Sequence, residues 1–579
     1  MEGILILVIL AAALGMRILP IRSDLPYFSS ADEVSYIETA LRFGTDAFQL
    51  SSYIHGALFQ GILFLAYAAY FLAGRLLGFF ASPTDYYVTY LADPTPFFLF
   101  ARGAAAAAGV GVVGLSYAVA SRMYHPRVGV LAGLFTAFSL LLFQMSFLGL
   151  ADMPAVFLLM LAAYLAVRSV EQPADRRAYA VAAALVGLAA ACKYHAGLGI
   201  VIVYVAAFLK ATSHANRIGV FLRLSVIGSV AAGVGFCLGI PQVLADPLRF
   251  YDDVFVRLSG QYTGYDPVGN AWLFLFTHHL RNGLGIPLLL TSLAGIGFAV
   301  YKRSQWDLLL LSLPLCMYLL FMRSVGFAYH LLPAVPFVLV LAARFLDAVA
   351  RQLPRRVGPA ASLVLAALVV IPTFLDCVRL IQVMRSPSTK TLAKDWIEDH
   401  LPAGATIMSE GYIFTAPVYG PPLLEARSTL ERDIAFVKEN GGTGLTPELR
   451  LAHYDRLYGE GKTYDILRVR EMDTEEIARQ RPRYLVTTSD KDRLAGDELA
   501  AMFTPAGYSQ RRSAGREYIA RDYTVLAAIA PTAAVTGFFP HLMDEDYHQI
   551  REWPLFSNRG SRGPTITIWE RRQASSKSP

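Results

Sequence analysis

Eleven long apolar runs constrain this sequence more than any other feature. A helix needs about 20 apolar residues to cross the hydrocarbon core of a bilayer. The runs come close to that length, or exceed it, at residues 3–20, 97–121, 128–148, 152–168, 178–193, 195–211, 218–240, 283–301, 307–323, 327–348 and 358–380. The chain is 55% hydrophobic and only 17% charged, and its mean hydropathy is +0.43. We therefore expect a polytopic α-helical membrane protein with about 11 transmembrane helices.

The last third of the chain has a different composition. From about residue 385 onward, Lys, Arg, Asp and Glu become frequent and the long apolar runs stop. Short apolar runs remain, among them "RYLVTT", "YTVLAAIA" and "TITIWE", and they are typical of strands between helices. We expect a membrane domain over residues 1–384 and a soluble α/β domain over residues 385–579. The soluble domain has no glycine-rich phosphate loop and no nucleophile motif, so an acceptor-recognition role and a purely structural role both stay open.

The distribution of basic residues predicts which loops face the cytoplasm. The apolar stretch 53–80 decides the matter, because counting it as a crossing inverts every later loop. If it does not cross, the positive-inside rule is satisfied by all five basic loops: Arg122/Arg127, Arg168/Arg176/Arg177, Lys210/Arg217, Lys302/Arg303 and Arg351/Arg355/Arg356. We therefore expect an inside N-terminus and an extracytoplasmic C-terminal domain, in the plasma (inner) membrane. Whether 53–80 lies in the interface or re-enters the bilayer stays open.

The net charge of +6 indicates no nucleic-acid partner, because membrane proteins collect Lys and Arg in their cytoplasmic loops. The four cysteines all fall in apolar stretches, and the polar C-terminal part has none. Neither a disulfide framework nor a cysteine-based metal site is indicated.

This topology gathers charged and aromatic residues from distant parts of the chain on the outer face. Asp32 and Glu33 lie in the first outer loop, in "SSADEVSYIETALRF". Asp152 stands at the outer start of one span, in "LGLADMPAVF", and Lys193 stands at a tight outer turn, in "ACKYHAG". Other polar residues of the same face lie in loops or near span ends: His55, Arg102, Arg257, Tyr262, Tyr329 and His330.

Some of these residues have a simpler explanation. A charge at the end of a span often extends into the headgroup region, and this alone would account for Arg102, Arg257 or His55. Serines followed by acids favour the start of a helix. Helix initiation explains one acid after "SS" adequately, but it does not explain why both Asp32 and Glu33 are present. Asp152 and Lys193 are flanked by apolar sequence on both sides, where a charge costs about 2.5–3.5 kcal/mol at mid-membrane. Such residues usually face a polar cavity.

Four motifs, in this order, resemble a known superfamily. "ADEVSY", "LADMPAVF", "KYHAG" and "YHLLPAVP" are similar to segments of the lipid-carrier-dependent glycosyltransferases of the GT-C fold, above all the protein O-mannosyltransferase and aminoarabinose transferase superfamily. The resemblance covers about residues 1–380 and includes "ARGAAAAAGVGVVGLSYAVASRMYHPRVGVLAG". It implies a glycosyltransferase that takes a hexosyl or pentosyl group from a polyprenyl-phosphate donor.

The resemblance also implies roles for individual residues. The catalytic acid of the family's first loop corresponds to Asp32, and Glu33 is the second letter of the acidic pair. The family's second acid corresponds to Asp152, and its lysine near the donor phosphate corresponds to Lys193.

The chemistry of sugar transfer agrees with these roles. Asp32 would take the proton of the acceptor hydroxyl, and Asp152 would orient the acceptor or assist Asp32. Lys193 would neutralise the leaving phosphate. We expect further donor-phosphate contacts from His330, Tyr329 and Arg257, and a substrate cavity that includes His55, Arg102 and Tyr262. A base and a phosphate-binding cation on opposite faces of the anomeric carbon imply inversion in one displacement.

The expected partners are a polyprenyl-phosphate-linked sugar, membrane lipid, and a glycan, lipid or protein acceptor. The resemblance suggests no obligatory catalytic metal, although acids and histidines on one face could bind Mg²⁺ or Mn²⁺. The main alternative is a membrane transporter or flippase for a lipid-linked or sugar substrate. Transporters often show inverted repeats, and the sequence shows no such symmetry. A non-catalytic scaffold would leave Asp152 and Lys193 without a reason.

Overall fold

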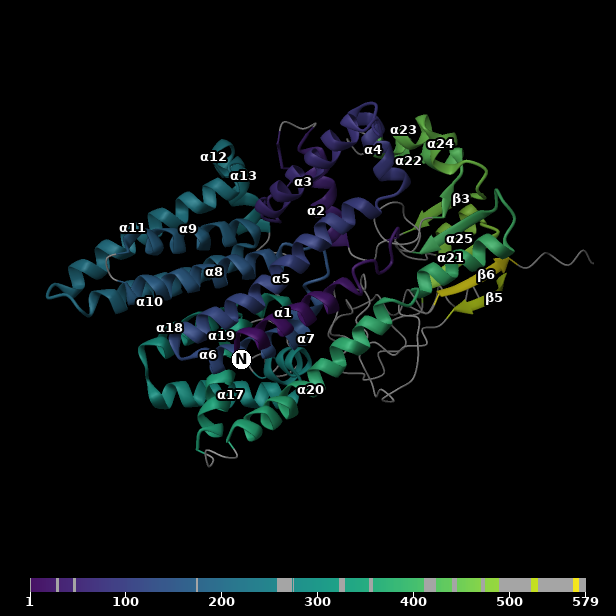
Figure 1. Cartoon of the computed structure of the whole chain (residues 1–579). Coiled ribbons are helices and arrows are strands. Elements are labelled where there is room, and N and C mark those ends of the chain that lie inside the picture. The colour runs from purple at the N-terminus through teal and green to yellow at the C-terminus, as the bar shows by residue number, and fades with distance from the viewer. Residues whose placement is uncertain are drawn as a thin grey trace, which may run out of the picture. The chain divides into compact units, whose positions relative to one another are not determined.

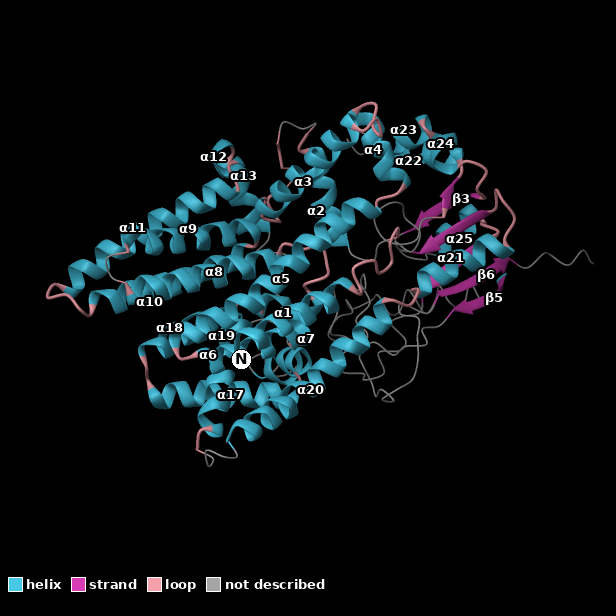
Figure 2. Cartoon of the chain, viewed as in Figure 1, coloured by secondary structure: helices cyan, strands magenta, loops and turns pink. Residues whose placement is uncertain are grey.

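The protein was analysed as a computed structural model that describes residues 2–27, 31–44, 48–50, 52–172, 175–257, 273, 275–321, 328–352, 358–410, 423–439, 445–469, 474–488, 522–529 and 566–571. Figure 1 shows the elements in chain order, and Figure 2 shows that helices dominate and that the strands are confined to one part of the chain. The chain divides into two compact units. The first unit holds Met1–Ile21, Ser35–Ala68 and Phe98–Ile381, and the second holds Arg22–Val34, Ala69–Phe97 and Gln382–Pro579.

Apolar helices make up the first unit, and they coincide with the eleven predicted spans. They are α1 (Glu2–Ile18), α5 (Thr95–Met123), α6 (Pro126–Phe138) with α7 (Leu140–Gln144), α8 (Asp152–Glu171), α9 (Arg176–Cys192), η1 (Tyr194–Gly199) with α10 (Ile200–Ala211), α11 (Arg217–Gly239), α17 (Ile286–Lys302), α18 (Gln305–Phe321), η4 (Ala328–Leu331) with α19 (Val335–Ala350), and α20 (Gly358–Met384). Short helices fill the loop between α11 and α17: α12 (Gln242–Ala245), α13 (Pro247–Tyr251), η2 (Asp252–Arg257), η3 (Leu275–Leu280) and α16 (Arg281–Leu284).

The chain is a polytopic α-helical membrane protein, as predicted, although fewer helices are full-length spans than expected. Within the described residues, six helices are long and apolar enough to cross a bilayer, or up to seven if the bent pair Leu275–Leu284 and Ile286–Lys302 counts as one span. Pro126–Phe138 and Gln305–Leu320 are apolar but shorter. The predicted run 128–148 is interrupted at Ser139, which is extended (ψ 117°) and ends α6. The Thr373 hydroxyl satisfies the backbone there, because it donates to the Phe138 carbonyl (2.8 Å) and accepts from the Leu140 N–H (3.3 Å).

Polar contacts join the loops that the sequence predicts to be cytoplasmic. These contacts are Glu2–Arg127 (3.8 Å), Tyr124–Asp307 (2.9 Å), His125–Asp347 (3.0 Å) and Lys210 to the Ser169 carbonyl (2.6 Å). At the opposite ends of the helices, Arg102 donates to the Ile21 carbonyl (3.0 Å), so α5 begins where α1 ends. An ion pair between Arg122 and Glu171 joins the end of α5 to the end of α8, so the basic loops share one end of the helix bundle.

The apolar stretch 53–80 contains α3 (Leu58–Leu76), whose length and composition alone would allow it to cross a bilayer. The chain before α3 lies against the end of α9, where a Cβ added to Gly56 would lie 2.2 Å from the Ala191 carbonyl oxygen. Since α5 begins at this same end, any crossing by α3 would need a return. The helix between them, α4 (Pro83–Ala92), has 10 residues and spans about 15 Å, half of a hydrocarbon core. That α3 does not cross remains a prediction of the basic loops.

The second unit contains a six-stranded sheet in the order β2-β3-β1-β4-β6-β5. Its strands are β1 (Thr406–Glu410), β2 (Leu424–Glu425), β3 (Thr463–Val469), β4 (Tyr484–Thr488), β5 (Tyr523–Ile529) and β6 (Ile566–Arg571). The first four strands pair in parallel, and β6 pairs antiparallel with both β4 and β5. The helices are α21 (Thr389–His400), α22 (Arg427–Glu439), α23 (Leu445–Ala452), α24 (Tyr454–Tyr458) and α25 (Thr474–Gln480). The predicted soluble α/β fold is confirmed.

The sheet has a core on both faces. One core joins Ala393 and Ile397 of α21 to Ile407 and Ile466 of the central strands, and the other packs Ile477 of α25 on the opposite face. The unit also holds Arg22–Val34 and Ala69–Phe97 from the first loop. The predicted boundary near residue 385 therefore describes only part of this unit.

Candidate active site

The site is built on the paired ends of α8 and α9. These helices run antiparallel, so that Asp152, the first residue of α8, and Lys193, which follows the last residue of α9, meet at one end. The Lys193 ammonium lies 3.3 Å from a carboxylate oxygen of Asp152. The macrodipole favours an acid at a helix N-terminus and a base at a C-terminus. Both helices therefore stabilise the charges that they carry.

Asp152 is nearly inaccessible to solvent, with 2% of its side chain exposed, whereas Lys193 keeps 15%. Neither carboxylate oxygen of Asp152 accepts a hydrogen bond of good geometry from the described residues. A buried carboxylate is normally satisfied by several donors. The single cation at 3.3 Å leaves acceptor capacity for a substrate hydroxyl.

Aromatic rings cover the lysine. The Lys193 ammonium lies 5.3 Å from the centroid of the Tyr329 ring, which is close enough for a cation–π interaction. The ring of Tyr329 meets that of His330 edge to face at 4.6 Å, and His330 meets His195 at 5.5 Å. The structure thus brings together four predicted residues from three parts of the chain. It adds His195, two residues after Lys193, which the sequence did not single out as functional.

His55 lies next to this cluster because its loop packs on the end of α9. The loop needs Gly56, since any Cβ there would lie 2.2 Å from the Ala191 carbonyl oxygen. The Tyr194 hydroxyl donates to the Tyr53 carbonyl (2.6 Å). The His55 ring in turn accepts or donates a hydrogen bond at 3.4 Å with the Tyr36 hydroxyl.

A buried acid in the loop after α11 holds the His55 loop from the other side. Asp253 is 2% exposed, and one of its carboxylate oxygens accepts from the Tyr53 N–H (3.0 Å) and from the Ser52 hydroxyl (3.4 Å). Arg249 lies 3.9 Å from the same oxygen. These contacts fix the His55 loop to the short helix η2.

Three predicted residues are not placed in this cluster. Arg102 is 1% exposed, donates to the Ile21 carbonyl (3.0 Å) and lies over the Phe98 ring, so its described contacts fix the end of α1. The backbone of Arg257 ends the short helix η2, but its side chain lies outside the described structure. Tyr262 lies outside the described residues.

Asp32 and Glu33 occupy the first turn of α2 (Ala31–Arg42), where the macrodipole favours acids. Glu33 is fully buried and Asp32 is partly exposed. Both belong to the second compact unit, while the same helix enters the first unit at Ser35. Asp32 stands one helical turn before Tyr36, on the same face of α2. Tyr36 is the residue that contacts His55.

Among the described residues, no group of three or more His, Cys, Asp or Glu side chains is arranged to hold a metal ion. A divalent cation therefore stays a prediction. The rings of His195 and His330, the strongest metal-ligand candidates by type, contact each other at 5.5 Å.

Comparison with protein families matches residues 98–233 to the dolichyl-phosphate-mannose-protein mannosyltransferase family. A comparison with curated proteins finds no match. Among solved structures, the chain is similar to ArnT from Cupriavidus metallidurans bound to undecaprenyl phosphate, with 13% identity, 99% of each chain covered and a TM-score of 0.51. It is also similar to the archaeal oligosaccharyltransferase AglB from Archaeoglobus fulgidus in complex with an inhibitory peptide and a dolichol phosphate. That match has 11% identity, covers 98% of this chain and 88% of AglB, and has a TM-score of 0.50.

Because the sequence identities are low, these similarities establish the fold of the chain and not its substrates. Helices that coincide with the predicted spans, the extended first loop and the C-terminal α/β unit are all included in the nearly full-length match. The chain has the GT-C fold that it shares with ArnT and AglB.

Proposed function

We propose that the protein transfers a sugar from a polyprenyl-phosphate donor to a hydroxyl of a glycan, lipid or protein acceptor, at the outer face of the plasma membrane. The observation that carries the proposal is the ion pair of buried Asp152 and half-buried Lys193, 3.3 Å apart at one end of an apolar helix bundle. A cation held there can receive a phosphate whose lipid stays in the bilayer. A carboxylate beside it can receive a hydroxyl.

Lys193 is the residue proposed to bind the donor phosphate. The donor phosphate is a diester with one negative charge, and once the sugar has left it is a monoester with a charge of about −1.5 to −2 and three strong acceptor oxygens. It can therefore compete with Asp152 for the lysine. Tyr329 lies against Lys193, and His330 contacts Tyr329, so we propose that both add polar contacts to the phosphate. A contact from Arg257, whose side chain lies outside the described structure, stays a prediction of the sequence.

An apolar cavity begins next to these residues. Its volume is about 340 Å³, and it lies between α17, α18 and α19. Leu331, the residue after His330, is part of its wall, together with Leu284, Ile296, Leu315, Val335 and Val338. A cavity of this size and lining suits part of a long hydrocarbon chain. The position supports a donor whose phosphate lies near His330 and whose polyprenyl chain continues between these helices.

The proposed reaction is one displacement with inversion. The acceptor oxygen forms a bond to the anomeric carbon as the bond from that carbon to the phosphate oxygen breaks. Asp32 takes the hydroxyl proton. A general base typically increases the rate of such a reaction by about 10²–10⁴-fold. Lys193 stabilises the negative charge on the polyprenyl phosphate that leaves. Asp152 orients the acceptor hydroxyl or assists Asp32.

The comparisons support this proposal at the level of substrate class. The matched family is described by a dolichyl-phosphate-mannose donor, and both similar structures hold a polyprenyl or dolichol phosphate. The outer-face location is supported by the basic loops, which share the end opposite to Asp152 and Lys193.

The test begins in the source organism with deletion of the gene. Mass analysis of cell-envelope glycans and lipids should reveal one sugar substituent that is lost on deletion and restored by the full chain. Membranes of the deletion strain that carry the restored protein then supply enzyme and acceptor, and radiolabelled undecaprenyl-phosphate mannose is the donor probe. Label should leave the lipid phase only when the protein is present. The same assay with EDTA, and then with Mg²⁺ or Mn²⁺, tests the cation. An unchanged envelope, with no transfer of label, would reject the proposed function.

A further inference from the structure

The loop that carries Asp32 is held by the C-terminal domain. The Lys394 ammonium of α21 lies 5.3 Å from the centroid of the Tyr27 ring, five residues before Asp32. Only 8% of Lys394 is exposed. It pairs with Glu398, one turn further along α21, at 2.5 Å. Burial alone would lower the pKa of Lys394, but the hydrogen bonds to Glu398 and Tyr27 raise it. The lysine is therefore charged when it faces Tyr27.

A second contact holds the other end of the same loop. Asp85 of α4 pairs with Arg456 of α24, and the Tyr87 hydroxyl lies 3.3 Å from the Thr446 hydroxyl of α23. The pKa of Asp85 is lowered because the Ala81 N–H and the Arg456 guanidinium both donate to its carboxylate.

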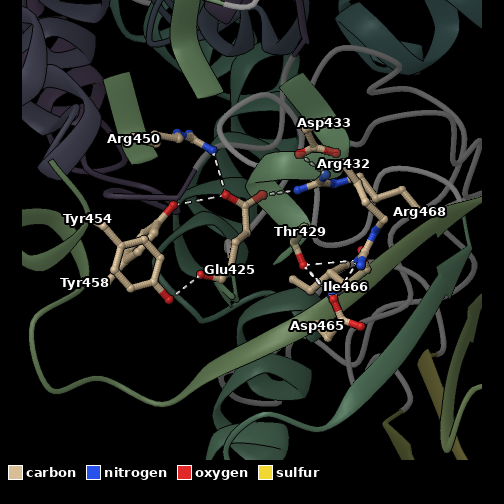
Figure 3. A network of polar contacts seen from close by, with 10 residues as sticks. All are labelled: Glu425, Thr429, Arg432, Asp433, Arg450, Tyr454, Tyr458, Asp465, Ile466 and Arg468. Carbon is tan, nitrogen blue, oxygen red and sulfur yellow. Dashed lines mark hydrogen bonds and ion pairs between the residues drawn. The ribbon is translucent and has the colours of Figure 1, made fainter. Parts of the chain in front are cut away.

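The helices that make this second contact are fixed to the sheet. Figure 3 shows the network around Glu425 at the end of β2, which is 1% exposed. Its carboxylate accepts from Arg450 of α23 (3.1 Å), from the Tyr458 hydroxyl of α24 (3.0 Å) and from Arg468 of β3. A buried carboxylate with three donors is costly to separate from any of them. Both α23 and α24 are thus rigid supports for α4.

The two contacts flank the part of the first loop that enters the helix bundle. Residues Arg22–Val34 and Ala69–Phe97 belong to the second unit, whereas Ser35–Ala68, with Tyr36 and His55, belongs to the first. We infer that the C-terminal domain is a positioning device for the first loop, and that Lys394 and Tyr27 are the positioning residues for Asp32. The inference rests on the proposed function, because it takes Asp32 as the base.

The expected size of the effect follows from the chain geometry. Tyr27 and Asp32 both belong to the segment Arg22–Val34 of the second unit and are five residues apart, so a shift of Tyr27 can shift the Asp32 carboxylate. A misplacement of about 1 Å can cost about 100-fold in rate. Loss of the contact should therefore reduce turnover and leave the donor phosphate site, which is built on α8 and α9, unchanged.

The experiment compares variants of the full chain. Lys394→Met keeps the aliphatic stem and removes the charge, and Tyr27→Leu removes the ring. Each should lower the rate of label transfer from undecaprenyl-phosphate mannose about 10-fold to 100-fold, with unchanged affinity for undecaprenyl phosphate in nanodiscs. Lys394→Arg and Tyr27→Phe, which keep cation and ring, should retain most of the rate. The double variant Lys394→Met with Tyr27→Leu should be no slower than the slower single variant.

Two controls separate positioning from general stability and from the proposed function. Lys438→Met removes a lysine of the exposed Lys438–Glu448 pair in the same domain and should leave the rate unchanged. Asp32→Glu lengthens the carboxylate by one methylene, and adding Lys394→Met should cost less in that background than in the natural chain. Equal losses in Lys438→Met, weaker binding of undecaprenyl phosphate in Lys394→Met, or independent effects with Asp32→Glu would each overturn the inference. A normal rate in Asp32→Asn would instead reject Asp32 as the base.

Discussion

Gly56 lies so close to the end of α9 that a Cβ on it would be 2.2 Å from the carbonyl oxygen of Ala191 and 2.6 Å from that of Cys192. This contact places the His55 loop beside Lys193. Gly56→Ala should force the loop away from α9, at a cost of about 1–3 kcal/mol. We expect a lower melting temperature and at least about 10-fold weaker binding of undecaprenyl phosphate, measured in nanodiscs.

Gly61→Ala is the matched control. Gly61 lies in α3, where an added Cβ meets nothing within 4 Å, and alanine favours a helix over glycine by about 1 kcal/mol. This variant should bind and melt as the natural chain does, or melt slightly higher. If Gly56→Ala behaved in the same way, the close contact would not fix the loop.

Substitutions of Asp152 and of Lys193 should change the affinity for undecaprenyl phosphate in opposite directions. Asp152→Asn removes the carboxylate that competes with phosphate for the lysine, so undecaprenyl phosphate should bind more tightly, by about 10-fold. Lys193→Ala removes a charge-assisted contact of about 1.5–3 kcal/mol, which corresponds to about 10-fold to 100-fold weaker binding. Titration of nanodiscs with undecaprenyl phosphate measures both.

Lys302→Ala serves as the control, because Lys302 is exposed at the end of the bundle that holds the basic loops. Its affinity for undecaprenyl phosphate should equal that of the natural chain. Weaker binding in both Asp152→Asn and Lys193→Ala would mean that the two residues act only as a structural pair.

The orientation of the bundle can be tested with single cysteines in a cysteine-free chain. Glu460, after α24, is exposed in the C-terminal domain, and Ser213, between α10 and α11, is exposed at the end of the helices that holds the basic loops. In intact cells, an impermeant thiol reagent should label position 460 and not position 213. In permeabilised cells it should label both. The reverse pattern would place the C-terminal domain inside.

The contact between Asp85 and Arg456 predicts a dependence on pH. The pKa of Asp85 lies below its ordinary value of 3.8, so its contribution to stability is present above the pKa of the unfolded chain and is lost as the pH falls through the folded value. Asp85→Asn should lower the melting temperature by a constant amount from pH 8 to pH 5. The difference should shrink only below about pH 3.8. A difference that disappears between pH 8 and pH 5 would show that another group controls this contact.

Much of the fold could be predicted from the sequence because a membrane-spanning helix needs a long apolar run. The basic loops likewise fixed the orientation of α5 relative to α1, and the runs at 483–488 and 565–570 marked β4 and β6. Strand β3 was not predicted, because the charged residues Asp465 and Arg468 of "TYDILRV" are three positions apart. They therefore interrupt the alternation of apolar and polar residues that is typical of a strand. Both side chains are used in ion pairs with α22.

The site was predictable only where a charge interrupts an apolar run. Asp152 and Lys193 met this condition, and their pairing followed from the antiparallel helices. His195 gave no such signal, because a single histidine after a lysine is more often part of a helix packing surface. The role of Gly56 and the attachment of Tyr27 to Lys394 depend on tertiary contacts between distant segments. No local pattern in the sequence encodes those contacts.

The acids of the first turn of α2 provide the most direct test of the mechanism. Asp32→Asn keeps the size and most of the hydrogen bonding of the side chain but removes its basicity, so the protein should fold and bind undecaprenyl phosphate normally. The rate of label transfer should fall about 10²–10⁴-fold, as expected for loss of a general base. Glu33→Gln should cost less, because Glu33 is fully buried whereas Asp32 keeps access to a substrate. Near-normal transfer by Asp32→Asn beside an inactive Glu33→Gln would move the base by one residue. Near-normal transfer by both would leave the two acids with the helix-starting role that their position in α2 also allows.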